Sequence, residues 1–208
     1  MKLLIVGSTG SIGVHLVTQA LEQGHTVTTF ARTPAKLDSI KHPNLRVVQG
    51  DVLDSESLVK AVAGQDAVLC SLGAGREGHV RSEGTRNVIR AMEQTGVKRF
   101  ICQTTLGAGD SRNTLNFFWK YIMFGLLLKK AYKDHELQER FIQQSHLDWT
   151  ITRPAAFVDG NRTGQYKHGF FESGADLTLK ISRADVADFM LKQLTNTTYF
   201  HKTPGQSY

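Results

Sequence analysis

The residues LLIVGSTGSIG (3–13) decide the fold, because they join a short apolar run to three evenly spaced glycines. The run at 3–6 predicts a buried β-strand, and the pattern from 11 to 23 predicts a helix. Gly7, Gly10 and Gly13 stand at the turn between them, where glycine permits a tight bend and brings backbone N–H groups close to a phosphate. The helix then offers its unpaired donors and its dipole to that charge. A purely structural glycine-rich turn is the alternative, and the position between strand and helix favours a dinucleotide site.

Short apolar runs alternate with amphipathic segments along the rest of the chain. Further strands are expected at residues 26–30, 45–49, 67–72, 100–105 and 149–153. Further helices are expected at residues 55–63, 80–94, 114–145 and 184–194. Strands that are apolar on both sides and alternate with helices indicate a parallel sheet covered on both faces. We therefore predict an α/β fold, a Rossmann-type doubly wound parallel sheet in a single domain over residues 1–208, with the substrate-side elements within about 106–180.

The composition is that of an ordinary globular domain, with 208 residues of which 40% are hydrophobic and 21% charged. It excludes intrinsic disorder, collagen-like repeats and disulfide-rich miniproteins. Cys70 and Cys102 lie in apolar runs, which favours reduced core thiols and a cytoplasmic protein. The histidines and cysteines lack metal-ligand spacing, so no metal site is expected. The formal net charge of +6 suits an anionic ligand, and no nucleic-acid motif or long basic run accompanies it, so no nucleic-acid partner is expected.

The most apolar stretch is LNFFWKYIMFGLLL, residues 115–128. Asn116 and Lys120 interrupt it, and it is shorter than the roughly 20 apolar residues of a membrane span, so no integral membrane segment is predicted. Two interpretations remain. The segment is either a helix that covers an apolar pocket or subunit interface, which is favoured, or an amphipathic element at a membrane surface, since Lys129, Lys130 and Lys133 follow at once.

The end of the second strand distinguishes the two nicotinamide cofactors. An NAD site usually places Asp or Glu there, to bind the ribose 2′-hydroxyl. Here the strand ends Phe30-Ala31-Arg32, with Lys36 close behind, and a guanidinium is well shaped to bind a 2′-phosphate. A solvated surface cation is the alternative for Arg32. The sequence predicts NADP(H) rather than NAD(H).

Seven segments together carry a family resemblance. They are GSTGSIG (7–13), ARTPAKL (31–37), GDVLD (50–54), SLG (71–73), SEGTRNVIRAM (82–92), DWTITRP (148–154) and ISRADVADFML (181–191). The chain resembles the atypical short-chain dehydrogenase/reductase superfamily in its NAD(P)-binding, NmrA-like branch, and within it the flavin reductase or biliverdin-IXβ reductase type. The resemblance implies a monomer with a Rossmann-type sheet that uses NADPH to reduce a planar, conjugated acceptor such as a flavin or a linear tetrapyrrole.

The resemblance also implies roles for individual residues. Those at the cofactor are the pyrophosphate loop (Gly7, Thr9, Gly10, Ser11, Ile12 and Gly13), the 2′-phosphate ligand Arg32, the adenine contacts Asp51 and Val52, and the segment along the cofactor, Leu72 and Gly73. A strand-end turn is the alternative for Asp51. Thr104 matches the position of an active-site Ser and His135 that of a histidine near the substrate, so these two are the candidate catalytic residues.

The chain departs from the family at two points. The second substrate-side histidine, expected after the proline of the Arg-Pro segment, is replaced by Ala155-Ala156-Phe157, which weakens the case for the same tetrapyrrole chemistry. Ordinary short-chain dehydrogenases use Tyr-x-x-x-Lys, in which the lysine lowers the pKa of the tyrosine. The residues four positions after Tyr121, Tyr132, Tyr166 and Tyr199 are Gly125, Glu136, Phe170 and Thr203. Alcohol–ketone oxidoreduction by that route is therefore disfavoured.

The remaining chemistry is hydride transfer to an acceptor whose ring system delocalises charge, since orientation over the nicotinamide then suffices. Thr105, Trp119 and Phe157 are expected to bind this substrate, with turn capping and core packing as their alternatives. We expect an NADPH-dependent reductase of a planar, anionic acceptor such as FMN or a biliverdin-type tetrapyrrole. The other hypothesis is a non-catalytic NADP(H)-binding regulatory or assembly factor of the NmrA-like type.

Overall fold

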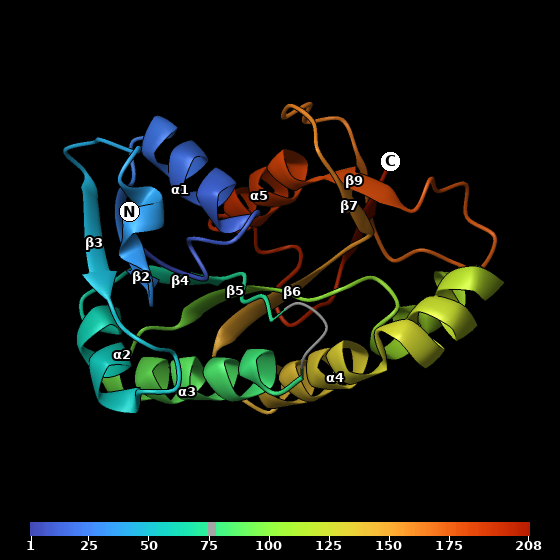
Figure 1. Cartoon of the computed structure of the whole chain (residues 1–208), viewed down its shortest axis with the longest axis horizontal. Helices are drawn as coiled ribbons and strands as arrows, with labels where there is room; N and C mark the ends of the chain where they lie inside the picture. Colours follow the sequence, from blue (N-terminus) through green and yellow to red (C-terminus); the bar gives the residue numbers. More distant parts are fainter. Residues whose placement is uncertain (75–77) are drawn as a thin grey trace.

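The computed structural model describes residues 1–74 and 78–208, which form a central sheet between two layers of helices (Figure 1). The first half contains β1 (Lys2–Val6), α1 (Gly13–Glu22), β2 (Thr26–Ala31), the short helix η1 (Pro34–Leu37), β3 (Leu45–Gln49), α2 (Ser55–Val62), β4 (Ala67–Cys70), α3 (Val80–Thr95) and β5 (Arg99–Gln103). The second half contains η2 (Gly109–Thr114), η3 (Phe118–Leu127), α4 (Lys129–Gln143), β6 (Asp148–Pro154), β7 (Ala156–Val158), β8 (Lys167–Gly169), β9 (Lys180–Ser182), α5 (Arg183–Lys192) and β10 (Gly205–Ser207).

The sheet has the strand order β3-β2-β1-β4-β5-β6-β10-β8. Strands β1 to β6 all pair in parallel, so their carboxyl ends meet at one edge. The predicted doubly wound Rossmann-type fold is therefore confirmed. The sheet is not wholly parallel, because β8 runs antiparallel to β10 at the far edge. Strands β7 and β9 form a separate parallel pair that continues from the carboxyl end of β6.

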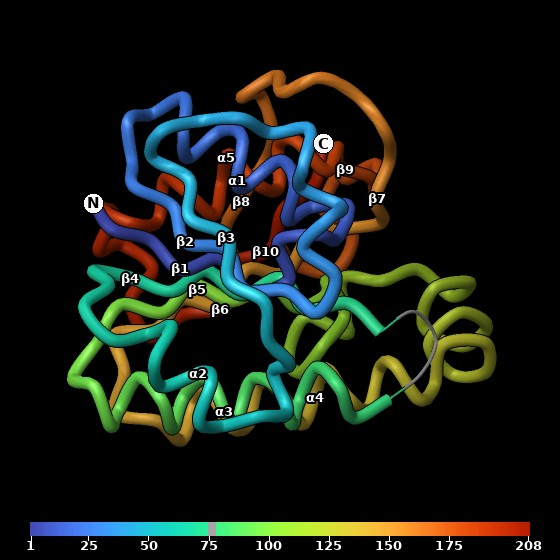
Figure 2. Tube along the Cα trace, turned by 60° about the vertical axis from the view of Figure 1, so that its left-hand side comes forward, coloured from blue at the N-terminus to red at the C-terminus, as the bar shows by residue number. Residues whose placement is uncertain are grey.

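Helices cover both faces of the sheet, with α2, α3 and α4 on one side and α1 and α5 on the other (Figures 1 and 2). Alternate residues of each strand point to opposite faces. In β1, Leu4 packs with the cluster under α2 and α3, whereas Leu3 and Ile5 pack with the cluster under α1 and α5. Both faces of β1 are thus fully buried, which explains why its sequence lacks a polar alternation.

The single long helix expected over residues 114–145 is interrupted. The Asn116 side chain accepts a hydrogen bond from the Trp119 backbone N–H at 3.1 Å and starts a new helix there, as asparagine commonly does at a helix N-terminus. Helix η3 is a wide π-helix, in which the Leu128 N–H donates to the carbonyl of Met123, five residues back. Across residues 1–74 and 78–208, none of the helices combines the length and the apolar character needed to cross a membrane.

A buried polar layer joins α3 and α4 to the sheet. Asp134 accepts hydrogen bonds from the Ser82 backbone and hydroxyl, and Gln138 donates to the Thr85 hydroxyl at 2.9 Å and to Cys102. Cys102 stands opposite Cys70 in the parallel register of β5 and β4, and both thiols are free and fully buried. His135 lies in the same layer, with Nδ1 at 3.1 Å from the side-chain oxygen Oε1 of Gln138. Burial, together with the charge of Arg81, lowers the pKa of His135 to about 4.

The depressed pKa of His135 predicts that acid destabilises the protein through this residue. Because the folded value of about 4 lies below the ordinary value of 6.5, the unfolded chain binds the proton more tightly, and stability is lost as pH falls below 6.5. Between about pH 7.5 and about pH 5 the loss is about 2 kcal/mol. His135→Asn keeps a donor for Gln138 but does not titrate, so urea unfolding at the two pH values should show a correspondingly smaller loss. His42→Asn, at an exposed position, is the matched control. An equal loss in H135N and the wild-type protein contradicts the assignment.

Candidate functional site

The loop between β1 and α1 requires glycine at two positions. Gly7 has a positive φ of 81°, and a Cβ there would lie 2.5 Å from the carbonyl oxygen of Ser71 at the end of β4. At Gly13 a Cβ would lie 2.1 Å from the Gly7 carbonyl oxygen. The loop therefore packs tightly between α1 and the neighbouring strand, as the spacing of the glycines predicts.

The same loop presents a site suited to a pyrophosphate. In the part of the chain that the structure describes, no side chain caps the N-terminus of α1 and no acidic residue stands in its first turn, so its positive dipole end is available to an anion. The hydroxyl oxygens of Ser8 and Ser71 are buried beside this loop and have no hydrogen-bond partner among the described residues. A phosphate group is a ligand that such donors fit.

A cavity of about 240 Å³ continues from the loop along the carboxyl ends of β1 to β4. It is lined by Gly7, Thr9, Gly10, Phe30, Ala31, Arg32, Lys36, Gly50, Val52, Leu72, Gly73 and Val80. Seven residues predicted to bind the cofactor are among these lining residues. Gly50 has a close approach of its own, since a Cβ there would lie 2.2 Å from the Phe30 ring.

The other four predicted cofactor residues lie beside this cavity without lining it. Ser11 is exposed, Ile12 is packed in the core, and Gly13 acts through its close contact with the loop. Asp51 accepts a hydrogen bond from the Leu53 backbone N–H at 2.9 Å, which is the turn arrangement that stood as the alternative to adenine binding.

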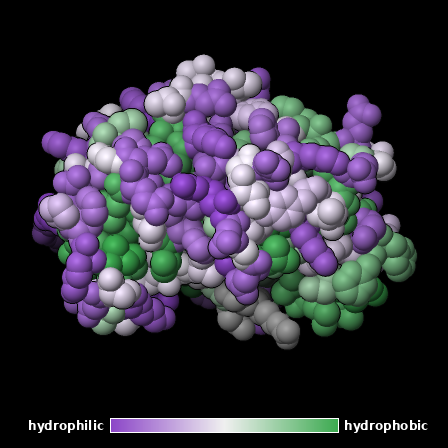
Figure 3. Space-filling view, turned by 90° about the horizontal axis from the view of Figure 1, so that it is seen from above, coloured by the Kyte–Doolittle hydropathy of each residue, from purple (hydrophilic) through white to green (hydrophobic). Residues whose placement is uncertain are grey.

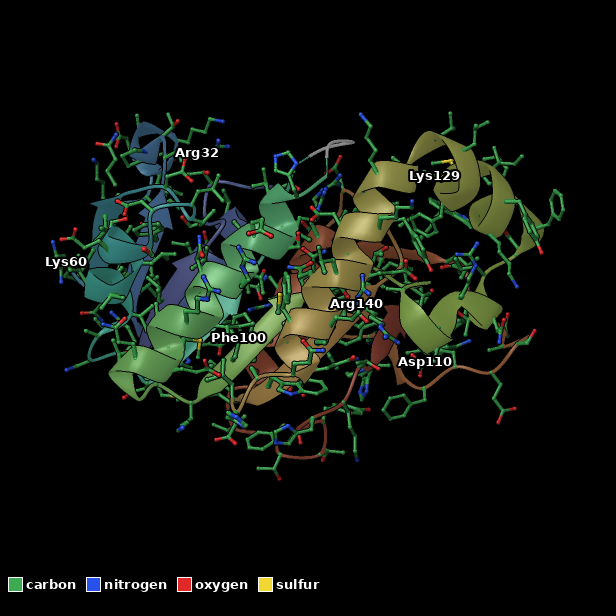
Figure 4. All side chains as sticks on the ribbon, turned by 90° about the horizontal axis from the view of Figure 1, so that it is seen from below. Arg32, Lys60, Phe100, Asp110, Lys129 and Arg140 are labelled. Carbon is green, nitrogen blue, oxygen red and sulfur yellow. The ribbon has the colours of Figure 1, made fainter. Side chains whose placement is uncertain are left out.

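Two cations line the cavity near the end of β2. Arg32 follows β2, and η1 carries Lys36 back to the same wall. None of the described residues that line the cavity is an Asp or Glu. Figure 4 shows Arg32 at one end of the molecule's long axis and Lys129, which follows η3, toward the other.

A second cavity, of about 340 Å³, lies over the carboxyl ends of β5 and β6 and is largely apolar. It is lined by Thr105, Leu106, Leu115, Trp119, Phe124, Leu128, Ala155, Ala156, Phe157, Leu179 and Arg183. The three residues predicted to bind substrate, Thr105, Trp119 and Phe157, come together here from three separate segments. The aromatic wall is continuous, since the Trp119 and Phe124 ring centroids are 5.9 Å apart.

Arg183 supplies the positive charge of this cavity and was missed from the sequence. It is the first residue of α5, whose N-cap Ser182 accepts from the Asp185 backbone N–H at 3.0 Å. Its guanidinium lies 5.8 Å from the centre of the Phe157 ring and 2.8 Å from the exposed carboxylate of Asp159. The Ser-Arg-Ala-Asp helix start was the available signal in the sequence. It was not sufficient, because in a doubly wound fold only some of the loops before the helices reach the binding edge.

The two candidate catalytic residues do not line either cavity. The Thr104 hydroxyl is buried and donates to Glu139 at 2.7 Å, and the same carboxylate receives two hydrogen bonds from Arg153 at 2.9 and 2.6 Å. Burial opposes the charge of Arg153, but its hydrogen bonds with Glu139 and Asp110 outweigh this and raise its pKa. His135 is held in the layer between α3 and α4 as a neutral imidazole at neutral pH.

The two cavities are neighbours by topology. The glycine-lined cavity occupies the ends of β1 to β4, the apolar cavity the ends of β5 and β6, and β4 pairs directly with β5. The two cavities therefore lie along the same edge of the sheet, which is the edge where doubly wound folds bind their ligands. Among residues 1–74 and 78–208, no cluster of His, Cys, Asp and Glu side chains is arranged to hold a metal ion.

Comparisons with known proteins agree with this geometry. A family profile described as NAD(P)H-binding matches residues 7–197. The photosystem II assembly factor Ycf39 of Synechocystis sp. is 29% identical over 98% of this chain, which spans only 61% of that relative's length. The solved anaerobillin reductase ChuY of Escherichia coli O157:H7 has a TM-score of 0.82 and 23% identity, covering 100% of this chain and 97% of its own.

A short-chain dehydrogenase/reductase of Veillonella parvula, solved in complex with NADP, also has a TM-score of 0.82, with 17% identity over 100% of this chain and 94% of that one. At such identities the structural likeness shows the fold. The family match over most of the chain goes further and agrees with the resemblance that the motifs carry. The chain belongs to the NAD(P)H-binding family.

Proposed function

We propose that this protein is an NADPH-dependent reductase that transfers hydride to a planar, conjugated acceptor, a flavin such as FMN or a biliverdin-type linear tetrapyrrole. The observation that carries the proposal is the placement of two complementary cavities along one edge of the sheet, at the carboxyl ends of strands that include the neighbours β4 and β5. One has the polar, glycine-rich form that a dinucleotide needs, and the other is an apolar slot with aromatic walls.

The preference for NADPH rests on Arg32 and Lys36. Both line the ribose end of the cavity, and two cations there suit a 2′-phosphate better than a hydroxyl. The Veillonella parvula protein of the same fold was solved with NADP, which supports the same cofactor here.

The chain's own part in the reaction is orientation and exclusion of water. When bound, NADPH supplies a hydride, which carries two electrons. Trp119 and Phe157 would hold the acceptor flat against the cofactor, and Leu106 and Leu179 would keep water from its face. Reduction of the acceptor needs one further proton, which we assign to solvent water because the conjugated ring system stabilises the anion until it is protonated.

The roles predicted for Thr104 and His135 stay predictions. For proton donation, each side chain would have to leave its present partner, Glu139 for Thr104 and Gln138 for His135, and reach the acceptor. In the described arrangement both instead fix the elements behind the site. Thr104 anchors the end of β5, directly before the cavity residue Thr105.

A second candidate function is a non-catalytic NADP(H)-binding assembly or regulatory factor. It is favoured by the likeness to Ycf39, which is named as an assembly factor, and by the absence of a Tyr-x-x-x-Lys motif in the sequence. Both functions require NADP(H) binding, and only the reductase converts an acceptor to product.

The reductase proposal predicts that the purified protein oxidises NADPH when FMN is added, as followed by the loss of NADPH absorbance. Trp119→Ala should lower kcat/KM by about 10-fold to 100-fold, because a wall of the acceptor cavity is lost. Phe118→Ala is the matched control, since Phe118 belongs to the same helix, is exposed and does not line the cavity. Tight NADP binding without turnover of FMN, bilins or quinones contradicts the reductase and supports the assembly factor.

The cofactor assignment predicts that Arg32→Asp weakens NADPH binding by about 100-fold, because a charge-assisted contact becomes a repulsion, and leaves NADH binding nearly unchanged. Calorimetric titration with both cofactors measures the two effects. Arg46→Asp, on exposed β3, makes the same change of charge away from the cavity and should alter neither. Equal losses for both cofactors in R32D would mean that Arg32 does not contact the 2′-phosphate.

Arg183 is predicted to bind the anionic group of the acceptor. Arg183→Gln should raise the KM for FMN by about 10-fold, the range expected when one charge-assisted hydrogen bond is lost. The KM for a neutral quinone such as menadione should stay the same, because it offers no anionic group. Steady-state kinetics with the two acceptors separates these effects, and a similar change for both argues that Arg183 only shapes the cavity.

A further inference from the structure

Helix η3 exposes an unusually large apolar surface. Six side chains project into solvent, which we call the η3 face: Phe117, Phe118, Tyr121, Ile122, Leu126 and Leu127. Phe117 and Leu126 are the most exposed, at 72% and 71%. Figure 3 shows this surface as a broad hydrophobic area at the end of the molecule where η3 lies. Contiguous apolar patches of this kind mark an interaction site on a protein surface.

The acceptor cavity does not account for the η3 face. Trp119 and Phe124 point into the cavity from the same helix, and Phe124 is buried against Tyr132 with a centroid distance of 5.2 Å. None of the six side chains of the η3 face lines that cavity. The helix thus has two apolar sides, one that forms the cavity wall and one that faces outward.

The charge around the η3 face is positive. Residues 115–133 contain four lysines, Lys120, Lys129, Lys130 and Lys133, and no Asp or Glu. Among the described acidic residues near this segment, Asp134 is held by Ser82 and Glu83 forms an ion pair with Arg86. An apolar surface edged by lysines complements a partner that has an apolar interior beneath a layer of anionic groups.

We propose that the η3 face docks the protein on an anionic lipid bilayer, with the aromatic and leucine side chains in the acyl boundary and the lysines at the headgroups. Aromatic residues such as Phe117 and Tyr121 are suited to that boundary, because their rings are apolar and the tyrosine keeps its hydroxyl in the polar region. A second copy of the chain fits less well. A two-fold contact through the η3 face would bring the like-charged Lys129 and Lys133 side chains of the two copies toward one another.

Sedimentation with lipid vesicles tests the docking without cofactor or acceptor, so the result does not depend on the reductase activity. The wild-type protein should bind vesicles of phosphatidylcholine with phosphatidylserine, bind phosphatidylcholine alone more weakly, and lose binding as salt rises. Lys129→Glu with Lys133→Glu should weaken binding to the anionic vesicles by at least about 10-fold. Phe117→Ser with Leu126→Ser should abolish it, because the inserting side chains are removed.

The matched control is Val47→Ser with Lys98→Glu, which changes an exposed apolar residue on β3 and an exposed lysine before β5. It should bind as the wild-type protein does. Circular dichroism and Tm confirm that each variant is folded, which is expected since the substituted side chains are exposed. The proposal is overturned if the wild-type protein binds neither kind of vesicle, or if K129E/K133E and F117S/L126S bind vesicles as well as the control variant does. It is also overturned if light scattering shows that the wild-type protein is a dimer and that F117S/L126S is a monomer.

Discussion

The ligand-binding edge depends on how closely α1 approaches the loop before it. The space for a Cβ at Gly13 is already taken by the Gly7 carbonyl oxygen, and the space at Gly7 by Ser71. This contact sets the position of α1, and α1 in turn holds α5, because Gln19 donates to the Ala184 carbonyl oxygen at 2.9 Å. Since α5 begins at Arg183, the glycine-rich loop and the charged end of the apolar cavity are linked through α1 and α5. A larger side chain at Gly13 would displace both.

The two cavities along the ligand-binding edge differ in the side chains that line them. Over β1 to β4 the lining combines four glycines, Thr9 and two cations with apolar side chains such as Phe30 and Val52, which suits a cofactor that carries both phosphates and a flat base. Over β5 and β6 it is aromatic and aliphatic, with Arg183 as the cation among the described lining residues. Behind the apolar half, Glu139 connects Thr104 with Arg153 and so ties the ends of these two strands to α4. Buried charges of this kind keep a binding edge in one geometry, because breaking either partner away leaves the other unpaired.

The parts of this arrangement that local sequence determines could be predicted. The strands expected at residues 26–30 and 45–49 appear within one residue of the expected bounds, and the glycine spacing indicated the tight loop before α1. The parts set by distant contacts could not. Strand β10 forms only because Gly205 and Gln206 pair with β6, and the sequence Gly-Gln-Ser has no apolar pattern that predicts a strand. The wide helix η3 packs Trp119 and Phe124 against the apolar cavity, and Arg183 reaches that cavity only through the placement of α5.

The register of β4 and β5 sets Cys70 and Cys102 side by side beneath α3 and α4, where Thr85 and Gln138 occupy their polar atoms. Neither sulfur has a path to solvent while the sheet and these helices stay together, since both residues are fully buried. A bulky thiol reagent can therefore react only during an opening that separates the helices from the sheet. The rate at which the native protein is labelled would measure the free energy or the rate of that opening, depending on which step is slower. The labelling rate of Cys70 and Cys102 thus reports on the stability of the core and does not require any activity at the ligand-binding edge.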